Sequence, residues 1–131
     1  MPTLFTKIIN GEIPSYNLYE DEFVVAILDI FPKQIGHTLI IPKVEIDYWV
    51  DLPDELVLRI NTVARNLAKA VQQATNCQRV GQMVVGTEVP HYHLHLIPIY
   101  ELTFDNKKLQ KQPSEVEFKE LQVRIIAQLT R

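Results

Sequence analysis

Apolar residues recur at steps of three and four between residues 56 and 71, which is the spacing of one buried face of a helix. These positions are Leu56, Ile60, Val63, Leu67 and Val71. The run Pro53-Asp54-Glu55 suits the first turn of this helix, and Thr75-Asn76 ends it. A second helix begins after Ser114, which forms a capping-box pattern with Glu117. Its apolar face holds Phe118, Leu121, Ile125 and Leu129.

Five shorter segments have the apolar, partly β-branched composition that favours strands. They cover residues 16–20, 23–29, 37–41, 79–85 and 91–98. A short helical turn at residues 4–10 precedes them and ends at Gly11, and the polar residues 105–113 predict a mobile loop. The order of these elements predicts an α+β fold, in which an antiparallel sheet is covered on one face by helices.

The chain has 131 residues, the usual size of one domain, so we expect a single domain over residues 1–131. Its formal net charge is −3 with both signs mixed along the chain, so no basic block marks a nucleic-acid surface. The single cysteine, Cys77, excludes an internal disulfide and fits a reducing compartment. No signal peptide or membrane-spanning run is present. We therefore expect a soluble cytoplasmic protein with neither nucleic acid nor membrane as a partner.

Three of the four histidines occupy alternating positions, at His91, His93 and His95. Alternate side chains of a strand project from the same face, so this spacing predicts a row of imidazoles on one face. Tyr92 and Leu94 then point to the opposite face, where an apolar core is expected.

Such a row of imidazoles has three interpretations. It can be a chance pattern on a solvated strand face. Two histidines two positions apart can both bind one Zn²⁺, with a third ligand from elsewhere. A neutral imidazole can also attack phosphorus at pH 7, while its neighbours donate hydrogen bonds to phosphate oxygens or protonate the leaving group. The spacing alone leaves the metal site and the nucleophile open.

Residues 89–98 carry a motif in which histidines alternate with apolar residues and two further apolar residues follow. The segment reads Val89-Pro90-His91-Tyr92-His93-Leu94-His95-Leu96-Ile97-Pro98 and resembles the signature of the histidine triad (HIT) family. Further blocks at residues 4–15, 20–30 and 36–43 resemble the family in the same order. The resemblance is closest to the nucleoside-phosphoramidase branch, and residues 99–131 are a less family-like C-terminal loop and helix.

The resemblance implies a HIT-like fold with a five-stranded antiparallel sheet and two main helices, paired into a homodimer. It implies a nucleotide hydrolase that acts at the α-phosphate of nucleoside phosphoramidates or nucleotidyl adducts, through a nucleotidyl-histidine intermediate. The bound group is the purine nucleoside monophosphate moiety, and neither a cofactor nor a metal is implied. A dinucleoside polyphosphate hydrolase or a nucleotidyl transferase is the alternative within the family. A zinc hydrolase using the three histidines, or a non-catalytic nucleotide sensor, is the alternative outside this class.

The resemblance assigns catalytic roles to the three histidines of the motif. His93 attacks the α-phosphorus, and the backbone carbonyl of His91 holds its Nδ1–H. His95 contacts the α-phosphate or the bridging atom. His37 is a buried support that hydrogen-bonds near His91.

The resemblance also assigns substrate-binding residues. Asp29 accepts hydrogen bonds from the ribose hydroxyls, although the residue type and position alone favour an ordinary turn carboxylate. Phe5, Ile8 and Ile30 line an apolar slot for the base, although apolar residues of this kind are core residues by default. Val89 and the loop from Gly86 offer backbone groups to the phosphate.

Several positions depart from the family pattern. Thr87 stands where glutamine is common, Ile99 where an arginine commonly follows the motif, and Glu45 where histidine is common. Thr3 and Thr6 occupy positions where some bacterial relatives have zinc-binding cysteines, so we expect no zinc site there. These departures leave the base and the leaving group open.

Overall fold

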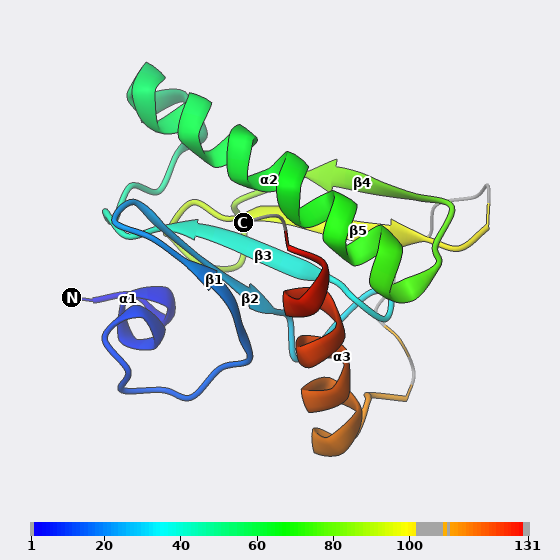
Figure 1. Cartoon of the computed structure of the whole chain (residues 1–131). Coiled ribbons are helices and arrows are strands. Elements are labelled where there is room, and N and C mark those ends of the chain that lie inside the picture. The colour runs from blue at the N-terminus through cyan, green and yellow to red at the C-terminus, as the bar shows by residue number, and fades with distance from the viewer. Residues whose placement is uncertain (1, 102–108, 110, 130–131) are drawn as a thin grey trace.

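The computed structural model describes residues 2–101, 109 and 111–129 (Figure 1). The helices are α1 (Leu4–Ile9), α2 (Asp54–Thr75) and α3 (Glu115–Gln128), with a 3-10 turn, η1, at Trp49–Asp51. The strands are β1 (Asn17–Glu20), β2 (Val24–Leu28), β3 (Thr38–Pro42), β4 (Arg79–Met83) and β5 (Leu94–Ile99). The α+β prediction is confirmed. The loop predicted at residues 105–113 lies largely outside the described residues.

The strands form one antiparallel sheet in the order β1-β2-β3-β5-β4. The predicted five-stranded antiparallel sheet is confirmed. The predicted apolar face of α2 is buried throughout, and it packs with α3 on one side of the sheet (Figure 1). On that side they meet the strand residues Ala26, Ile40 and Leu94. These contacts form the main hydrophobic core, whose burial is the dominant favourable term in folding.

The sequence predicted helices on one face of the sheet only. Helix α1 differs from this prediction, because it packs on the face opposite α2 and α3. Phe5 of α1 lies in a second apolar cluster with Val25, Ile27, Leu39 and Ile41. Val25 and Ile27 alternate along β2 with Ala26, which belongs to the main core, so the two clusters lie on opposite faces. The short α1 is therefore the cover of the sheet face on which the histidines lie.

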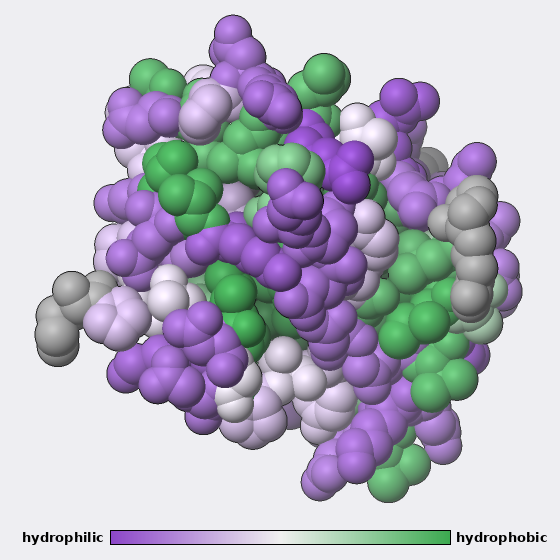
Figure 2. Space-filling model, turned by 60° about the vertical axis from the view of Figure 1, so that its left-hand side comes forward, coloured by the Kyte–Doolittle hydropathy of each residue, from purple (hydrophilic) through white to green (hydrophobic). Residues whose placement is uncertain are grey.

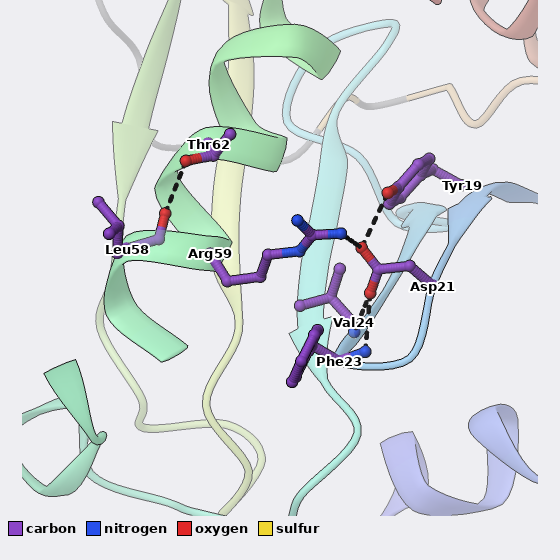
Figure 3. A network of polar contacts seen from close by, with 7 residues as sticks. All are labelled: Tyr19, Asp21, Phe23, Val24, Leu58, Arg59 and Thr62. Atoms are coloured by element: carbon purple, nitrogen blue, oxygen red, sulfur yellow. Dashed lines mark hydrogen bonds and ion pairs between the residues drawn. The ribbon is translucent and has the colours of Figure 1, made fainter. Parts of the chain in front are cut away.

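Asp21 connects the turn between β1 and β2 to helix α2 (Figure 3). Its Oδ1 accepts from the backbone N–H groups of Phe23 and Val24 at 2.7 and 2.9 Å. Its Oδ2 accepts from Tyr19 Oη and from Arg59 Nη2, each at 2.8 Å. The Arg59 guanidinium also lies 5.5 Å from the centre of the Phe23 ring. These contacts fix the first hairpin against α2.

The described surface mixes hydrophobic and hydrophilic side chains (Figure 2). Hydrophobic side chains on the face shown in Figure 2 form separate groups between hydrophilic ones. Across the described ranges, every helix is too short or too polar to cross a membrane. Cys77 is buried, as expected for a small apolar residue.

Candidate functional site

The histidine motif lies at the start of β5, on the face covered by α1. The predicted strand over residues 91–98 is wrong at its start. The strand begins at Leu94, so His91 and His93 precede it and only His95 lies within it. The reason is that the backbone N–H of His91 bonds to Val89 O and that of Tyr92 to Ile46 O, outside the sheet ladder. Tyr92 and Leu94 still point into the main core. The predicted strand at residues 79–85 similarly ends early, at Met83.

His93 is oriented by a main-chain carbonyl, as the resemblance implied. Its Nδ1 lies 2.8 Å from the carbonyl oxygen of His91. A carbonyl can only accept, so Nδ1 carries the proton and Nε2 of the neutral ring keeps its lone pair. The Phe5 ring lies edge-on to His93, with 4.8 Å between the ring centres. The unprotonated nitrogen of His93 is thus Nε2, the atom that a nucleophile requires.

The proton of His95 is placed by a chain of contacts through His37. The backbone N–H of Lys33 donates to His37 Nδ1 at 3.0 Å, so the proton of His37 is on Nε2. This Nε2–H donates to His95 Nδ1 at 2.9 Å, which places the proton of neutral His95 on Nε2. Burial, and then repulsion from His37 and His93 when those rings are protonated, lowers the pKa of His95 to about 4. His95 is therefore a neutral hydrogen-bond donor at pH 7.

His37 is buried, as predicted, but its partner differs from the prediction. The resemblance implied a hydrogen bond near His91, whereas His37 Nε2 bonds to His95. Strand pairing explains the difference, because β3 lies beside β5 with Leu39 opposite His95, and His37 directly precedes β3. His37 consequently lies behind His95 and not in the lining of the cavity described below.

An apolar cavity of about 180 Å³ lies beside His93 and His95. The predicted residues Phe5, Ile8, Asp29, Ile30 and Val89 all line it. Residues that the sequence did not single out complete the lining, among them Leu4, Pro14, Phe31 and Glu88. Nothing in the local sequence pattern marks these residues, because they come from separate loops and helices that only the fold brings together.

Asp29 follows β2 and faces two environments. Its Oδ1 accepts from the Phe31 backbone N–H at 2.9 Å, which is the turn contact that the residue type alone favours. Its Oδ2 lies 3.6 Å from His37 Nε2. Because Asp29 also lines the cavity, the carboxylate combines the turn role with a position at the candidate site.

A larger cavity of about 480 Å³ lies near the start of α2, away from the histidines. Its two cations are already paired, Lys43 with Glu20 and Arg59 with Asp21, each at 2.8 Å. The smaller cavity is the better candidate because it combines an apolar wall with two imidazoles in fixed tautomers.

One group in the described part of the chain has the geometry to hold a metal ion. Asp29, His37 and His95 each offer one ligand atom, and these atoms lie within 4.8 Å of one another. The group differs from the three-histidine zinc site considered from the sequence, because His91 and His93 direct ring nitrogens to main-chain carbonyls. His37 and His95 are already joined by a hydrogen bond without a metal.

The fold and site together define a small α+β domain that presents two fixed histidines, His93 and His95, to an apolar cavity. The HIT domain family model matches residues 10–102. An uncharacterized HIT-like protein of Borreliella burgdorferi is 37% identical over 131 residues, which cover 93% of this chain and 94% of that protein. Adenosine 5′-monophosphoramidase HNT1 of Saccharomyces cerevisiae is 43% identical over 96 residues, 72% of this chain and 61% of the yeast protein.

The solved structures agree with the sequence relatives. The crystal structure of a HIT-like protein from Bartonella henselae has a TM-score of 0.85 and 32% identity, covering 97% of this chain and 96% of the other. The chain belongs to the HIT domain family.

Proposed function

We propose that the protein is a nucleotide hydrolase that cleaves a bond at the α-phosphate of a purine nucleoside phosphoramidate or nucleotidyl adduct. One observation carries the proposal: His93 holds its Nδ1 proton against the His91 carbonyl at 2.8 Å, at the wall of an apolar cavity. This arrangement leaves Nε2 as the unprotonated atom of the His93 ring.

The proposed reaction has two displacement steps at phosphorus. In the first, His93 Nε2 forms a bond to the α-phosphorus, the bond to the leaving group breaks, and the leaving group departs with a proton taken from solvent. In the second, water attacks the same phosphorus, the bond to Nε2 breaks, and the attacking water releases one proton to solvent. The products are the nucleoside monophosphate and free His93, so the enzyme returns to its starting state.

The other residues of the site fit the binding of a nucleoside monophosphate. His95 donates its Nε2–H to a phosphate oxygen as negative charge builds there. Asp29 accepts from the ribose hydroxyls, and Val89 with the loop from Gly86 offers backbone groups to the phosphate. Phe5, Ile8 and Ile30 form the slot for the base.

The name of the yeast relative, an adenosine 5′-monophosphoramidase, supports a phosphoramidate as the substrate. A dinucleoside polyphosphate hydrolase or a nucleotidyl transferase remains the alternative within the same chemistry, since only the leaving group or the acceptor differs. We further propose that the protein acts as a homodimer in the cytoplasm and requires no metal.

The test is mass spectrometry of the protein mixed with nucleoside phosphoramidates and dinucleoside polyphosphates, with a chelator present throughout. The parent should form a nucleotidyl adduct that is labile in acid and persists in base, as a phosphorus–nitrogen bond to histidine does. The variant His93→Ala should form no adduct and lose several orders of magnitude of turnover, because the two-step route loses its intermediate.

His95→Ala is the matched control, since it removes a neighbouring imidazole but keeps the nucleophile. It should be slower and still form adduct. Turnover of His93→Ala equal to the parent would refute the proposal. Activity that disappears with the chelator and returns with zinc would favour a metal enzyme at Asp29, His37 and His95.

A further inference from the structure

A hydrogen-bond network joins the N-terminus of α1 to the buried ring of His91. Thr3 Oγ1 lies 2.8 Å from His91 Nδ1, and Glu45 Oε1 accepts from the Thr3 backbone N–H at 2.7 Å. The Thr6 hydroxyl donates to the same Glu45 oxygen at 2.8 Å. The His91 ring is fully buried, whereas Glu45 is exposed. The network therefore connects a surface carboxylate with the residue whose carbonyl holds His93.

The partners determine the direction of these hydrogen bonds. His91 Nε2 lies 2.8 Å from the carbonyl oxygen of Pro42, which can only accept, so Nε2 carries the proton. His91 Nδ1 of the neutral ring then accepts from the Thr3 hydroxyl. The Thr3 oxygen in turn accepts from the Thr6 backbone N–H at 3.1 Å, as the N-cap of α1. Both ring nitrogens of His91 are thus satisfied.

We propose that Thr3, Thr6 and Glu45 form a positioning network that fixes the His91 carbonyl and so maintains the reactive tautomer of His93. The inference rests on the proposed role of His93 as the nucleophile. A ring anchored at both nitrogens leaves its own backbone little freedom, and the His91 carbonyl moves with that backbone. None of the three residues lines the cavity beside His93, so they act through His91.

The network also fixes one wall of the cavity. Thr3 caps α1, and α1 carries Phe5, whose ring centre lies 4.8 Å from that of His93 and 5.9 Å from that of His91. Positive charge builds on the His93 ring during attack, and the Nδ1–H bond to the carbonyl then strengthens. A carbonyl that is already in place stabilises this charge without rearrangement.

Glu45 is a carboxylate at neutral pH. The Thr3 N–H and then the Thr6 hydroxyl lower its pKa below the usual value. The network is therefore intact at neutral pH, and an acceptor is present for both donors.

The first measurement is nitrogen-15 NMR of labelled histidines in the full chain without substrate. The parent should show His93 mainly as the Nδ1–H tautomer. Thr3→Val removes the hydroxyl with little change of shape and should give a mixture of the two His93 tautomers, whereas Thr3→Ser should match the parent. Glu45→Ala should shift the tautomer in the same direction as Thr3→Val, and Glu45→Gln should restore it because the amide oxygen still accepts.

The second measurement compares two quantities for each variant, the rate of nucleotidyl-adduct formation and the affinity for AMP. Thr3→Val and Glu45→Ala should lower the rate between about tenfold and hundredfold, as small misplacements of a reacting group do. AMP affinity should change less than the rate. Thr62→Val, which removes a hydroxyl bond to Leu58 O on the exposed face of α2, is the matched control and should behave as the parent.

The two measurements separate the network from the reaction. An unchanged His93 tautomer in folded Thr3→Val and Glu45→Ala would overturn the positioning proposal, even if the parent forms adduct. A shifted tautomer in a protein that never forms adduct would support the network and refute the proposed reaction. If Thr3→Val fails to fold, Glu45→Ala and Glu45→Gln decide the question, since Glu45 lies outside α1.

Discussion

His95 is neutral in the folded protein at pH 7 and well below it, although histidine usually titrates near pH 6.5. Its burial, together with His37 and His93, lowers its pKa to about 4, while the nearby Asp29 opposes this shift and Lys33 adds to it. Between these pH values the unfolded chain binds a proton that the folded chain does not. The folded state must therefore lose stability as the pH falls from about 6.5 to about 4.

We predict that this loss amounts to at most about 3 kcal/mol for His95. The measurement is the free energy of unfolding in urea at several pH values for the parent and His95→Gln. The difference in the free energy of unfolding between the two proteins should change with pH between about pH 4 and pH 6.5. Above this range it should be constant, because glutamine does not titrate. Parallel curves for the two proteins across the window would show that His95 titrates normally.

Asp29 should make the site sensitive to the ribose hydroxyls. We predict that AMP binds more tightly than 2′-deoxy-AMP by about 1–3 kcal/mol, the range for hydrogen bonds to a charged group. Calorimetry with the two nucleotides measures this difference.

Asp29→Asn is a matched control, because one amide oxygen can keep the turn bond to Phe31 while the amide nitrogen replaces the second acceptor. The variant should bind both nucleotides with nearly equal affinity. Equal affinities in the parent would remove Asp29 from the site.

At this scale the sequence indicated which residues lie near the candidate cavity better than it indicated their contacts. The motif and the resemblance named Phe5, Asp29 and His93, which all line one cavity. The contacts of Thr3 with His91 and of His37 with His95 span 88 and 58 residues. Such contacts depend on how the strands pair, which no local pattern of residue types contains.

The contact between the first hairpin and α2 depends on a charge pair. Burial by itself raises the pKa of Asp21, but the N–H groups of Val24 and Phe23, the Tyr19 hydroxyl and Arg59 together lower it. The carboxylate form is therefore the one that the folded state favours, and its contribution disappears as the pH falls below the usual value for aspartate.

We predict that Asp21→Asn destabilises the protein by about 1–3 kcal/mol, because it keeps the turn acceptor but removes the charge facing Arg59. Arg59→Met keeps much of the apolar stem over Phe23 and removes the cation. A double-mutant cycle in urea should give a coupling of about 1 kcal/mol between the two residues. Additive effects would show that the ion pair contributes nothing, and turnover should be unchanged in each variant.

Helices were easier to predict than strands in this chain. The apolar period identified α2, because this signal repeats along the whole helix. The capping box of Ser114 and Glu117 placed the start of α3, because both residues lie within one turn. The strand before Leu94 was predicted too long, because alternation of side chains persists even where the backbone bonds elsewhere. The position of α1 on the opposite face was missed, since six residues carry too little pattern to show which face they cover.

At the scale of the whole molecule, the described sheet ends in an edge strand, β4. In the described sheet β4 is the last strand and pairs with β5 on one side. Exposed apolar side chains lie nearby in the chain at Val84 and Val85. An edge strand with apolar neighbours is a common place for symmetric association.

We predict a homodimer in solution. Light scattering at micromolar concentration should give about twice the chain mass of 15.2 kDa, and the mass should fall on dilution below the dissociation constant. A monomer at every concentration would contradict this architecture and leave the chemistry of His93 unaffected.

Three main-chain groups, the carbonyls of Pro42 and His91 and the N–H of Lys33, determine where three imidazoles carry their protons. Substitution of a side chain cannot delete a peptide carbonyl, so point mutation affects this part of the site only by displacing the backbone, as the Thr3 and Glu45 variants are designed to do. The same peptide geometry could be built into an unrelated scaffold whose surrounding side chains share nothing with this protein. A search for comparable catalysts should therefore match backbone atoms around a histidine before it matches residue types.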